Sequence, residues 1–222
     1  MDNAIRFSIV IPTKDRASSL KRALDALDAQ TVQDYELIVV DGGSSDATET
    51  LVQAFGTRHP VQWRVQSQSG LVHAMNLARS WARGAIFIRT DDDVVFAPGW
   101  LQAIGEAFAS DPAIGGVTVP TVIPPAYGQT RDLFYYLARM REGRGLWRLV
   151  RAWYGRYLLE GDPYRIGRWC RSGAFTVGTN FPAALEAPIQ EVDNLEACNW
   201  AVRRDLLEQV GGFDPVFGGV GE

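Results

Sequence analysis

Four short strand-like runs, each followed by a helical or polar segment, constrain the fold of this chain more than any other feature. The runs are FSIVI (7–11), ELIVV (36–40), VQWRV (61–65) and AIFIR (85–89). Between them, apolar residues recur at the three- and four-residue spacing of amphipathic helices. Strands that alternate with helices of this length form right-handed βαβ units around a mostly parallel sheet. We therefore predict a Rossmann-like α/β fold, with helices flanking the sheet.

Composition narrows the class of protein. The chain has 222 residues, of which 46% are hydrophobic, enough to bury one sizeable core. No run approaches the roughly 18 apolar residues that cross a bilayer, and the N-terminus lacks a signal-peptide pattern, so we expect the chain to begin in the cytoplasm. The cysteines and histidines lack metal-binding spacing, so we expect neither a zinc site nor a disulfide framework. The formal net charge of −4 argues against general nucleic-acid binding.

Positive charge is concentrated in one segment. Residues 131–171 hold ten arginines and four acids, a net charge of +6, which leaves −10 for the remainder. This segment follows a proline-rich crossover near residue 120, and its first part, 131–160, is predicted to be helical. Between Leu146 and Tyr157, apolar and aromatic side chains line one face and arginines the opposite one. We interpret 131–160 as a helical, Arg/aromatic-rich insertion.

Polar residues follow three of the predicted strands at the points where these strands end. PTKD follows the first strand, DGGSSD the second, and DDD the fourth. Because the ligand crevice of such a sheet lies beyond the carboxyl ends of its strands, one pocket would collect all three groups. The residues that we assign to this pocket are Pro12, Thr13, Asp15, Asp41, Gly43, Asp91, Asp92 and Asp93.

The three consecutive acids need a positive partner. Like charges packed this closely repel one another and are costly to desolvate. A solvated turn would avoid the cost, but the place of the acids at a strand end favours Mg²⁺ or Mn²⁺, held by one or two carboxylates and a substrate's phosphates. We expect the ion to contact only one of Asp91 and Asp93.

The turn after the second strand has two interpretations. Its glycines and serines are typical of a strand-to-helix turn, and Asp46 with Glu49 has the spacing of a helix-opening capping box. That reading leaves Asp41 unexplained. A carboxylate there can accept the N–H of a nucleobase, and Gly43 would let a planar ring approach the backbone. Further along, Arg203 and Arg204 are either surface charges or partners of a diphosphate.

The order of these motifs resembles that of the family-two inverting nucleotide-sugar glycosyltransferases of the A-type fold. The motifs are IVIPTKDR, ELIVVDGGSSDAT, GAIFIRTDDDVVF and CNWAVRRDLLEQVGGFD, and the resemblance covers about residues 5–120 and 190–222. It implies that residues 1–120 form the nucleotide-sugar (donor) binding half. Residues 121–222 would form the acceptor-side half, which includes the insertion.

The resemblance also implies roles for single residues. Pro12, Thr13, Asp15 and Asp41 would hold the nucleotide, with Asp41 on the base. Asp91–Asp93 would be the DxD-type metal and diphosphate motif, with Asp93 as the direct ligand. The GGFD motif would introduce a loop that ends in an acidic pair near the acceptor. Glu222 matches the beginning of that pair, where the chain ends, so the chain looks truncated at its C-terminus. The catalytic base is then Glu222, a residue beyond it, or Asp193 or Glu191.

We therefore expect a metal-dependent glycosyltransferase of polysaccharide biosynthesis. It would move a sugar, with inversion, from a nucleoside-diphosphate sugar to a hydroxyl of a glycan, lipid-linked or protein acceptor. UDP is the nucleotide that we favour, and Mn²⁺ or Mg²⁺ is the cofactor. The absence of GxxxxGK and GxGxxG motifs argues against P-loop and dinucleotide-binding enzymes.

The alternative is a non-catalytic module of the same fold, which acts at a membrane surface or in an assembly through the Arg/aromatic helix. This helix could lie on anionic lipid at the inner face of the membrane. Our preferred interpretation is that its apolar face covers the sheet or a partner subunit, which leaves a homodimer open.

Overall fold

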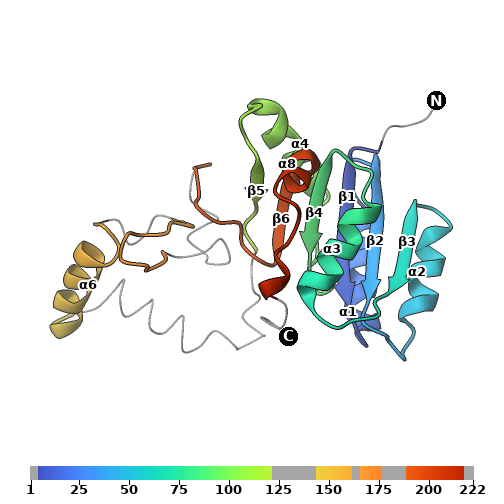
Figure 1. Cartoon of the computed structure of the whole chain (residues 1–222), viewed down its shortest axis with the longest axis horizontal. Helices are drawn as coiled ribbons and strands as arrows, with labels where there is room; N and C mark the ends of the chain where they lie inside the picture. Colours follow the sequence, from blue (N-terminus) through green and yellow to red (C-terminus); the bar gives the residue numbers. More distant parts are fainter. Residues whose placement is uncertain (1–4, 122–143, 162–165, 177–188, 218–222) are drawn as a thin grey trace. The chain divides into compact units, whose positions relative to one another are not determined.

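The computed structural model describes residues 5–121, 144–161, 166–176 and 189–217 (Figure 1). Its contacts divide the chain into two compact units. The first contains Met1–Val117 and Ala197–Glu222, and the second contains Thr118–Glu196. The predicted division into donor and acceptor halves concerns function and stays a prediction.

A six-stranded sheet forms the centre of the first unit (Figure 1). The strand order is β3-β2-β1-β4-β6-β5. Strands β3, β2, β1 and β4 run parallel, whereas β6 runs antiparallel to β4. The prediction of a mostly parallel sheet flanked by helices is confirmed. The strands are β1 (Phe7–Thr13), β2 (Tyr35–Asp41), β3 (Val61–Val65), β4 (Ile86–Thr90), β5 (Gly116–Thr118) and β6 (Asn199–Arg203).

The helices follow the strands as the alternating pattern predicts. Each long helix of the first unit buries one stripe of side chains, for example Leu20, Leu24 and Leu27 of α1. On another helix, Ala74 and Ala78 pack against the sheet beside Phe87. The helices of this unit are α1 (Ala17–Asp28), α2 (Thr48–Gly56), α3 (Leu71–Trp81), α4 (Trp100–Ser110) and α8 (Arg204–Gln209), followed by a 3₁₀ turn, η2 (Pro215–Phe217).

The strand order creates one point where the direction of winding reverses. The chain proceeds from β1 to β2 and β3 on one side, and β4 lies on the other side of β1. The loops that follow β1 and β4 therefore separate at their carboxyl ends. This is the topological switch point, where sheets of this kind form their ligand crevice.

Only half of the capping box predicted for α2 forms. The helix begins at Thr48, and its N-cap, Ala47, makes no side-chain capping bond. Asp46 accepts the N–H of Thr48 on Oδ1 (3.1 Å), which satisfies a donor of the first turn, and the N–H of Ala17 on Oδ2 (2.8 Å). Glu49 accepts a bond from Gln53 and does not return to the cap. The bond from Ala17, the first residue of α1, is a tertiary contact that residue spacing within one helix does not predict.

The second unit contains helix α6 (Leu146–Tyr157). Its apolar stripe consists of five side chains that point to solvent, and the exposed fraction is 74% for Leu146 and 58% for Trp153. Within the helix, Gly155 is the buried residue. The interpretation that this stripe covers the sheet or a partner subunit stays a prediction, because the sheet belongs to the first unit. The apolar stripe is Leu146, Leu149, Val150, Trp153 and Tyr157.

None of the described helices combines the length and the apolar character that a membrane-spanning segment needs.

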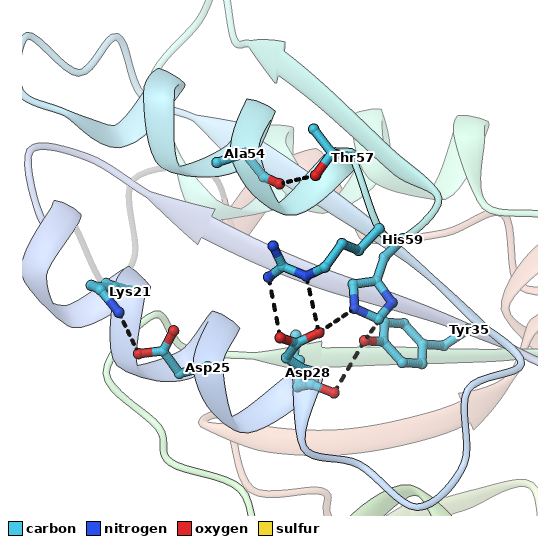
Figure 2. Close-up of polar contacts among 9 residues, drawn as sticks. Lys21, Asp25, Asp28, Tyr35, Ala54, Thr57 and His59 are labelled. Atoms are coloured by element: carbon cyan, nitrogen blue, oxygen red, sulfur yellow. Dashed lines mark hydrogen bonds and ion pairs between the residues drawn. The ribbon is translucent and has the colours of Figure 1, made fainter.

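A polar cluster joins α1, β2 and the end of α2 (Figure 2). Asp28, the last residue of α1, accepts bonds from His59 Nε2 (2.6 Å) and Arg58 Nη2 (3.1 Å). His59 stacks on Phe55, and its Nδ1 lies 3.3 Å from the hydroxyl of Tyr35. The bonds from His59 and then Arg58 hold the pKa of Asp28 below its usual value. The ionised carboxylate therefore stabilises the packing of α1 beside α2.

This cluster predicts a pH-dependent stability. Because the folded-state pKa of Asp28 is lowered, its contribution to the free energy of unfolding is present at neutral pH. The contribution is lost as the pH falls below about 4, toward the folded-state pKa. Urea unfolding of the wild type and Asp28→Asn should differ most at neutral pH and converge in acid.

Asp25→Asn is the matched control, because Asp25 forms an exposed pair with Lys21 on the same helix (Figure 2). Such pairs contribute only about 0.3–0.5 kcal/mol. A difference between wild type and Asp28→Asn that does not change with pH would contradict the ionic role of Asp28.

Candidate functional site

Two loops at the carboxyl edge of the sheet are bound to each other. The parallel register sets Thr13, the last residue of β1, beside Asp41, the last residue of β2. In the loops that follow, the N–H of Asp15 donates to Ser44 Oγ (2.8 Å), and the N–H of Ser45 donates to Asp15 Oδ1 (2.7 Å). Asp15 has a φ of 51°, a left-handed conformation uncommon for non-glycine residues. These reciprocal bonds hold the two loops as one wall.

Asp41 is buried at the base of this wall. Its Oδ1 accepts the N–H groups of Gly43 (3.0 Å) and Ser44 (2.8 Å). Its Oδ2 accepts the indole N–H of Trp63 at 3.3 Å. Gly43 has a φ of 85°, which favours glycine. The carboxylate thus shapes its own loop, and its proposed contact with a nucleobase stays a prediction, with the more weakly bonded Oδ2 as the acceptor.

Asp92 connects the end of β1 to the acids that follow β4. Its side chain is 3% exposed, and its Oδ2 accepts the hydroxyl hydrogen of Thr13 at 2.7 Å. Arg16 approaches its Oδ1 at 3.0 Å. Burial raises the pKa of Asp92, although Thr13 and Arg16 act in the opposite direction. This carboxylate is therefore the most enclosed of the three consecutive acids.

The flanking acids are less buried. Asp91 accepts a bond from Arg89 at 2.5 Å, and Asp93 accepts one from Arg16 at 2.7 Å. Their side chains are 33% and 47% exposed, respectively. Burial, followed by the charges of Asp93 and Asp92, raises the pKa of Asp91 against the opposing effect of Arg89. In the structure, two arginines are thus positive partners of the three acids, whereas the sequence suggested only a cation.

The structure does not separate Asp91 from Asp93. Strand β4 ends at Thr90, and the next residues form a turn in which Asp92 is buried and its two neighbours reach solvent. Both outer carboxylates therefore remain candidates for binding an ion.

The acids fit a divalent cation of the hard, oxygen-binding kind. Three carboxylates face two arginines, so the group retains a net charge of −1 before any ligand binds. Over the described residues, no cluster of three or more His, Cys, Asp or Glu could enclose a metal alone. Mg²⁺ and Mn²⁺ sites of the type expected here use one or two carboxylates and complete the shell with water and substrate phosphates.

Sequence reasoning missed the two arginines of this site. Arg89 is a buried charge in an apolar strand, two residues before Asp91, and this was a usable signal because a buried arginine needs a negative partner. Arg16 lies in the PTKDR motif, where nothing in the sequence links it to residues 77 positions away.

The proposed diphosphate role of Arg203 and Arg204 is wrong. Strand β6 runs antiparallel to β4, so Arg203 pairs with Ile86 and Asn199 pairs with Thr90. Arg203 therefore lies at the amino-terminal edge of the sheet, whereas the acids follow the carboxyl end of β4. The sequence indicates that the two arginines follow a strand, but it does not indicate that this strand is antiparallel to its neighbour.

Neither candidate base belongs to the described part of the first unit, which carries the acids. Asp193 belongs to the second unit, where its Oδ2 accepts the N–H of Trp169 (2.9 Å). Glu222 lies outside the described residues. Both assignments stay predictions. In contrast, Pro12 lies in β1 opposite Val40, directly before Thr13.

The sequence comparison gives the family of this chain. The sequence model of the family described as Glycosyl transferase family 2 matches residues 8–159, so the chain belongs to that family. The chain is 34% identical to a PGL/p-HBAD biosynthesis glycosyltransferase of Mycobacterium bovis over 118 residues. This match covers 50% of this chain and 46% of the relative.

A validoxylamine A glucosyltransferase of Streptomyces hygroscopicus is 32% identical over 106 residues, which cover 46% of this chain and 25% of the relative. The chain thus spans about half or less of the length of these curated relatives.

Solved structures agree on the fold. The mannosyltransferase PcManGT of Pyrobaculum calidifontis, in complex with GDP-Man and Mn²⁺, aligns with a TM-score of 0.58 at 22% identity, over 94% of this chain and 47% of that one. TarS of S. aureus, in complex with UDP, aligns with a TM-score of 0.62 at 14% identity, over 97% of this chain and 52% of that one. The fold is accordingly the A-type glycosyltransferase fold.

The bond between Thr13 and Asp92 predicts a measurable loss of stability. Thr13→Val should lower the free energy of unfolding by about 1–3 kcal/mol, because it leaves a buried carboxylate oxygen without its donor. Thr13→Ser is the matched control, since it keeps the hydroxyl. Urea unfolding at neutral pH measures both, and a Val variant as stable as the Ser variant would contradict this account.

Proposed function

We propose that the protein transfers a sugar from a nucleoside-diphosphate sugar to an acceptor hydroxyl, with inversion and with a divalent cation. The observation that carries the proposal is the convergence of Asp91–Asp93 and the two bonded loops at the switch point of the sheet. Family membership supports it. The names of the relatives, which are those of glycosyltransferases, also support the proposal.

The donor would lie across the carboxyl edge. The wall formed by Thr13, Asp15 and Asp41 would hold the nucleoside, and Gly43 would allow the base to approach the backbone. Asp91–Asp93 would face the diphosphate. UDP remains the nucleotide that we favour, although the solved relatives include complexes with both GDP-Man and UDP.

Asp93 and Asp91 are the side chains that would hold Mn²⁺ or Mg²⁺, because they are the two partly exposed carboxylates of the group. When bound, the cation would neutralise the charge that develops on the leaving diphosphate. Arg16 pairs with both Asp92 and Asp93. If a cation replaced Arg16 as the partner of Asp93, one N–H group of Arg16 would become available to a diphosphate oxygen.

Inversion requires a single in-line displacement at the anomeric carbon. A carboxylate takes the proton of the acceptor hydroxyl as the new bond forms. This base would be Glu222, Asp193 or Glu191. The acceptor would be a hydroxyl of a glycan, of a lipid-linked molecule or of a protein.

Asp93→Asn tests the donor site directly. We expect the variant to fold as the wild type does and to lose Mn²⁺-dependent binding of the nucleoside diphosphate by at least tenfold, because the amide is a poor ligand for a hard cation. Isothermal titration of UDP and GDP, with and without Mn²⁺, measures the effect. Asp111→Asn is the control, since Asp111 is an exposed acid just after α4. Unchanged metal-dependent affinity would remove Asp93 from its role.

The exposed apolar stripe of α6 favours a second proposal, contact with an anionic membrane surface. The segment from Arg144 to Leu159 contains four arginines and no acid. Helices with an apolar face, interfacial aromatic residues and a cationic polar face lie in the headgroup region of anionic bilayers. Such contact would bring the enzyme to a lipid-linked acceptor, or would serve a module without catalytic activity.

Vesicle flotation tests this contact. The wild type should float with vesicles that contain phosphatidylserine and stay in solution with pure phosphatidylcholine. Trp153→Ser with Leu149→Ser should abolish flotation, whereas Arg22→Gln, an exposed arginine of α1, should not change it. Absence of flotation, or a dimer that the stripe variants dissociate, would instead assign the stripe to a protein contact.

A further inference from the structure

A pocket of about 390 Å³ lies at the amino-terminal edge of the sheet, near the start of β4. Its volume is at the lower end of the range for small-molecule sites. Three of the side chains around it are arginines, two of which are the pair that the sequence singled out and the donor site does not use. The lining residues are Arg6, Ala85, Ile86, Phe108, Ala109, Arg203, Arg204 and Asp205.

The three guanidinium groups bond to neutral partners. Arg6 Nη2 donates to the carbonyl of Gly105 (2.8 Å), and Arg204 Nε donates to that of Gly84 (2.8 Å). Arg203 donates to the carbonyls of Ile114 (2.7 Å) and Phe108 (2.9 Å). Among the residues that the structure describes, none of these three arginines forms an ion pair. Each guanidinium has five N–H donors, so donors remain for a ligand.

Close packing holds two of these groups in place. The guanidinium of Arg6 lies over the ring of Phe7 at 5.0 Å, and that of Arg203 lies over the ring of Phe108 at 5.2 Å. A Cβ at Gly105 would come within 2.7 Å of Arg6 Nη2, so the helix surface is shaped around the guanidinium. The positive groups are therefore positioned before any ligand binds, which lowers the entropic cost of binding.

The charge around the pocket is unbalanced. Three half-buried arginines face one acid, Asp205, which is exposed and whose Oδ1 accepts the N–H of Leu206. The lining therefore carries a net charge of +2. Half-buried cations without counter-ions carry an electrostatic cost that a bound anion would relieve.

We propose that this pocket binds a small organic phosphate. Its phosphate dianion would meet the guanidiniums of Arg6, Arg203 and Arg204, whose fork-like geometry suits phosphate oxygens. Its organic part would lie against Phe108 and Ala109. The site is at the opposite edge of the sheet from Asp91–Asp93, and it needs neither the cation nor the sugar donor of the proposed function.

Calorimetric titration of the metal-free protein with phenyl phosphate tests the site, with inorganic phosphate and phenol as companion ligands. We expect saturable one-to-one binding of phenyl phosphate, weaker binding of inorganic phosphate and none of phenol. Arg204→Gln should weaken binding at least tenfold. Ala109→Glu should do the same by adding a negative charge while keeping every arginine and its carbonyl bonds. Circular dichroism verifies the fold of each variant.

Asp93→Asn and Arg22→Gln separate this site from the donor site and from general electrostatic attraction, and both should bind phenyl phosphate as the wild type does. The proposal is overturned if millimolar phenyl phosphate does not bind, if Arg204→Gln and Ala109→Glu leave binding unchanged, or if Asp93→Asn abolishes it. The first result would mean that the arginines serve only to bond the carbonyl groups around the end of α4.

Discussion

The burial of one carboxylate, Asp92, is the constraint on which the rest of the carboxyl edge depends. A charge that is 3% exposed needs fixed partners, and it finds them in Thr13 at the end of β1 and Arg16 in the following loop. These contacts join residues 79 and 76 positions apart, across the point where the sheet reverses its winding. The loops that would hold a nucleotide are therefore positioned relative to the acids that would hold its diphosphate.

Other carboxylates at the carboxyl edge of the sheet also need hydrogen-bond partners, and these bonds shape the loops there. Asp41 is bonded by its own loop and Asp15 by the neighbouring loop after β2, in both cases through backbone N–H groups and serine hydroxyls. A site built from carboxylates in this way is rigid where the nucleoside would bind. It retains negative charge where Asp91 and Asp93 reach solvent, which is the chemical condition for recruiting a cation together with a phosphate.

The two edges of the sheet differ in charge. Acids dominate the carboxyl edge, whereas Arg6, Arg203 and Arg204 gather at the amino-terminal edge around neutral carbonyl groups. The net charge of −4 conceals this separation along the strands, as it conceals the positive segment that contains α6. One domain thus presents surfaces suited to a metal-bound diphosphate and to a free anion.

The sequence predicted the features that depend on local pattern. Buried strands and helix faces repeat with a fixed period, so the parallel sheet and the position of the acids after β4 followed from FSIVI, ELIVV and AIFIR. Features that depend on distant partners were missed or misread. Asp46 bonds to Ala17 of helix α1, and Arg203 lies on an antiparallel strand. Neither feature follows from spacing, because each depends on which segment packs beside it.

The most direct test of the central claim is thermal unfolding of the chain with UDP, GDP, dTDP and CMP, each with and without Mn²⁺. A ligand at about 100 times its dissociation constant raises the free energy of unfolding by roughly 2.7 kcal/mol, which is visible as a shift in Tm. The account predicts that one nucleoside diphosphate stabilises the protein only when Mn²⁺ is present. No shift with any nucleotide, or an equal shift without the metal, would contradict a donor site in which Asp91–Asp93 hold the cation.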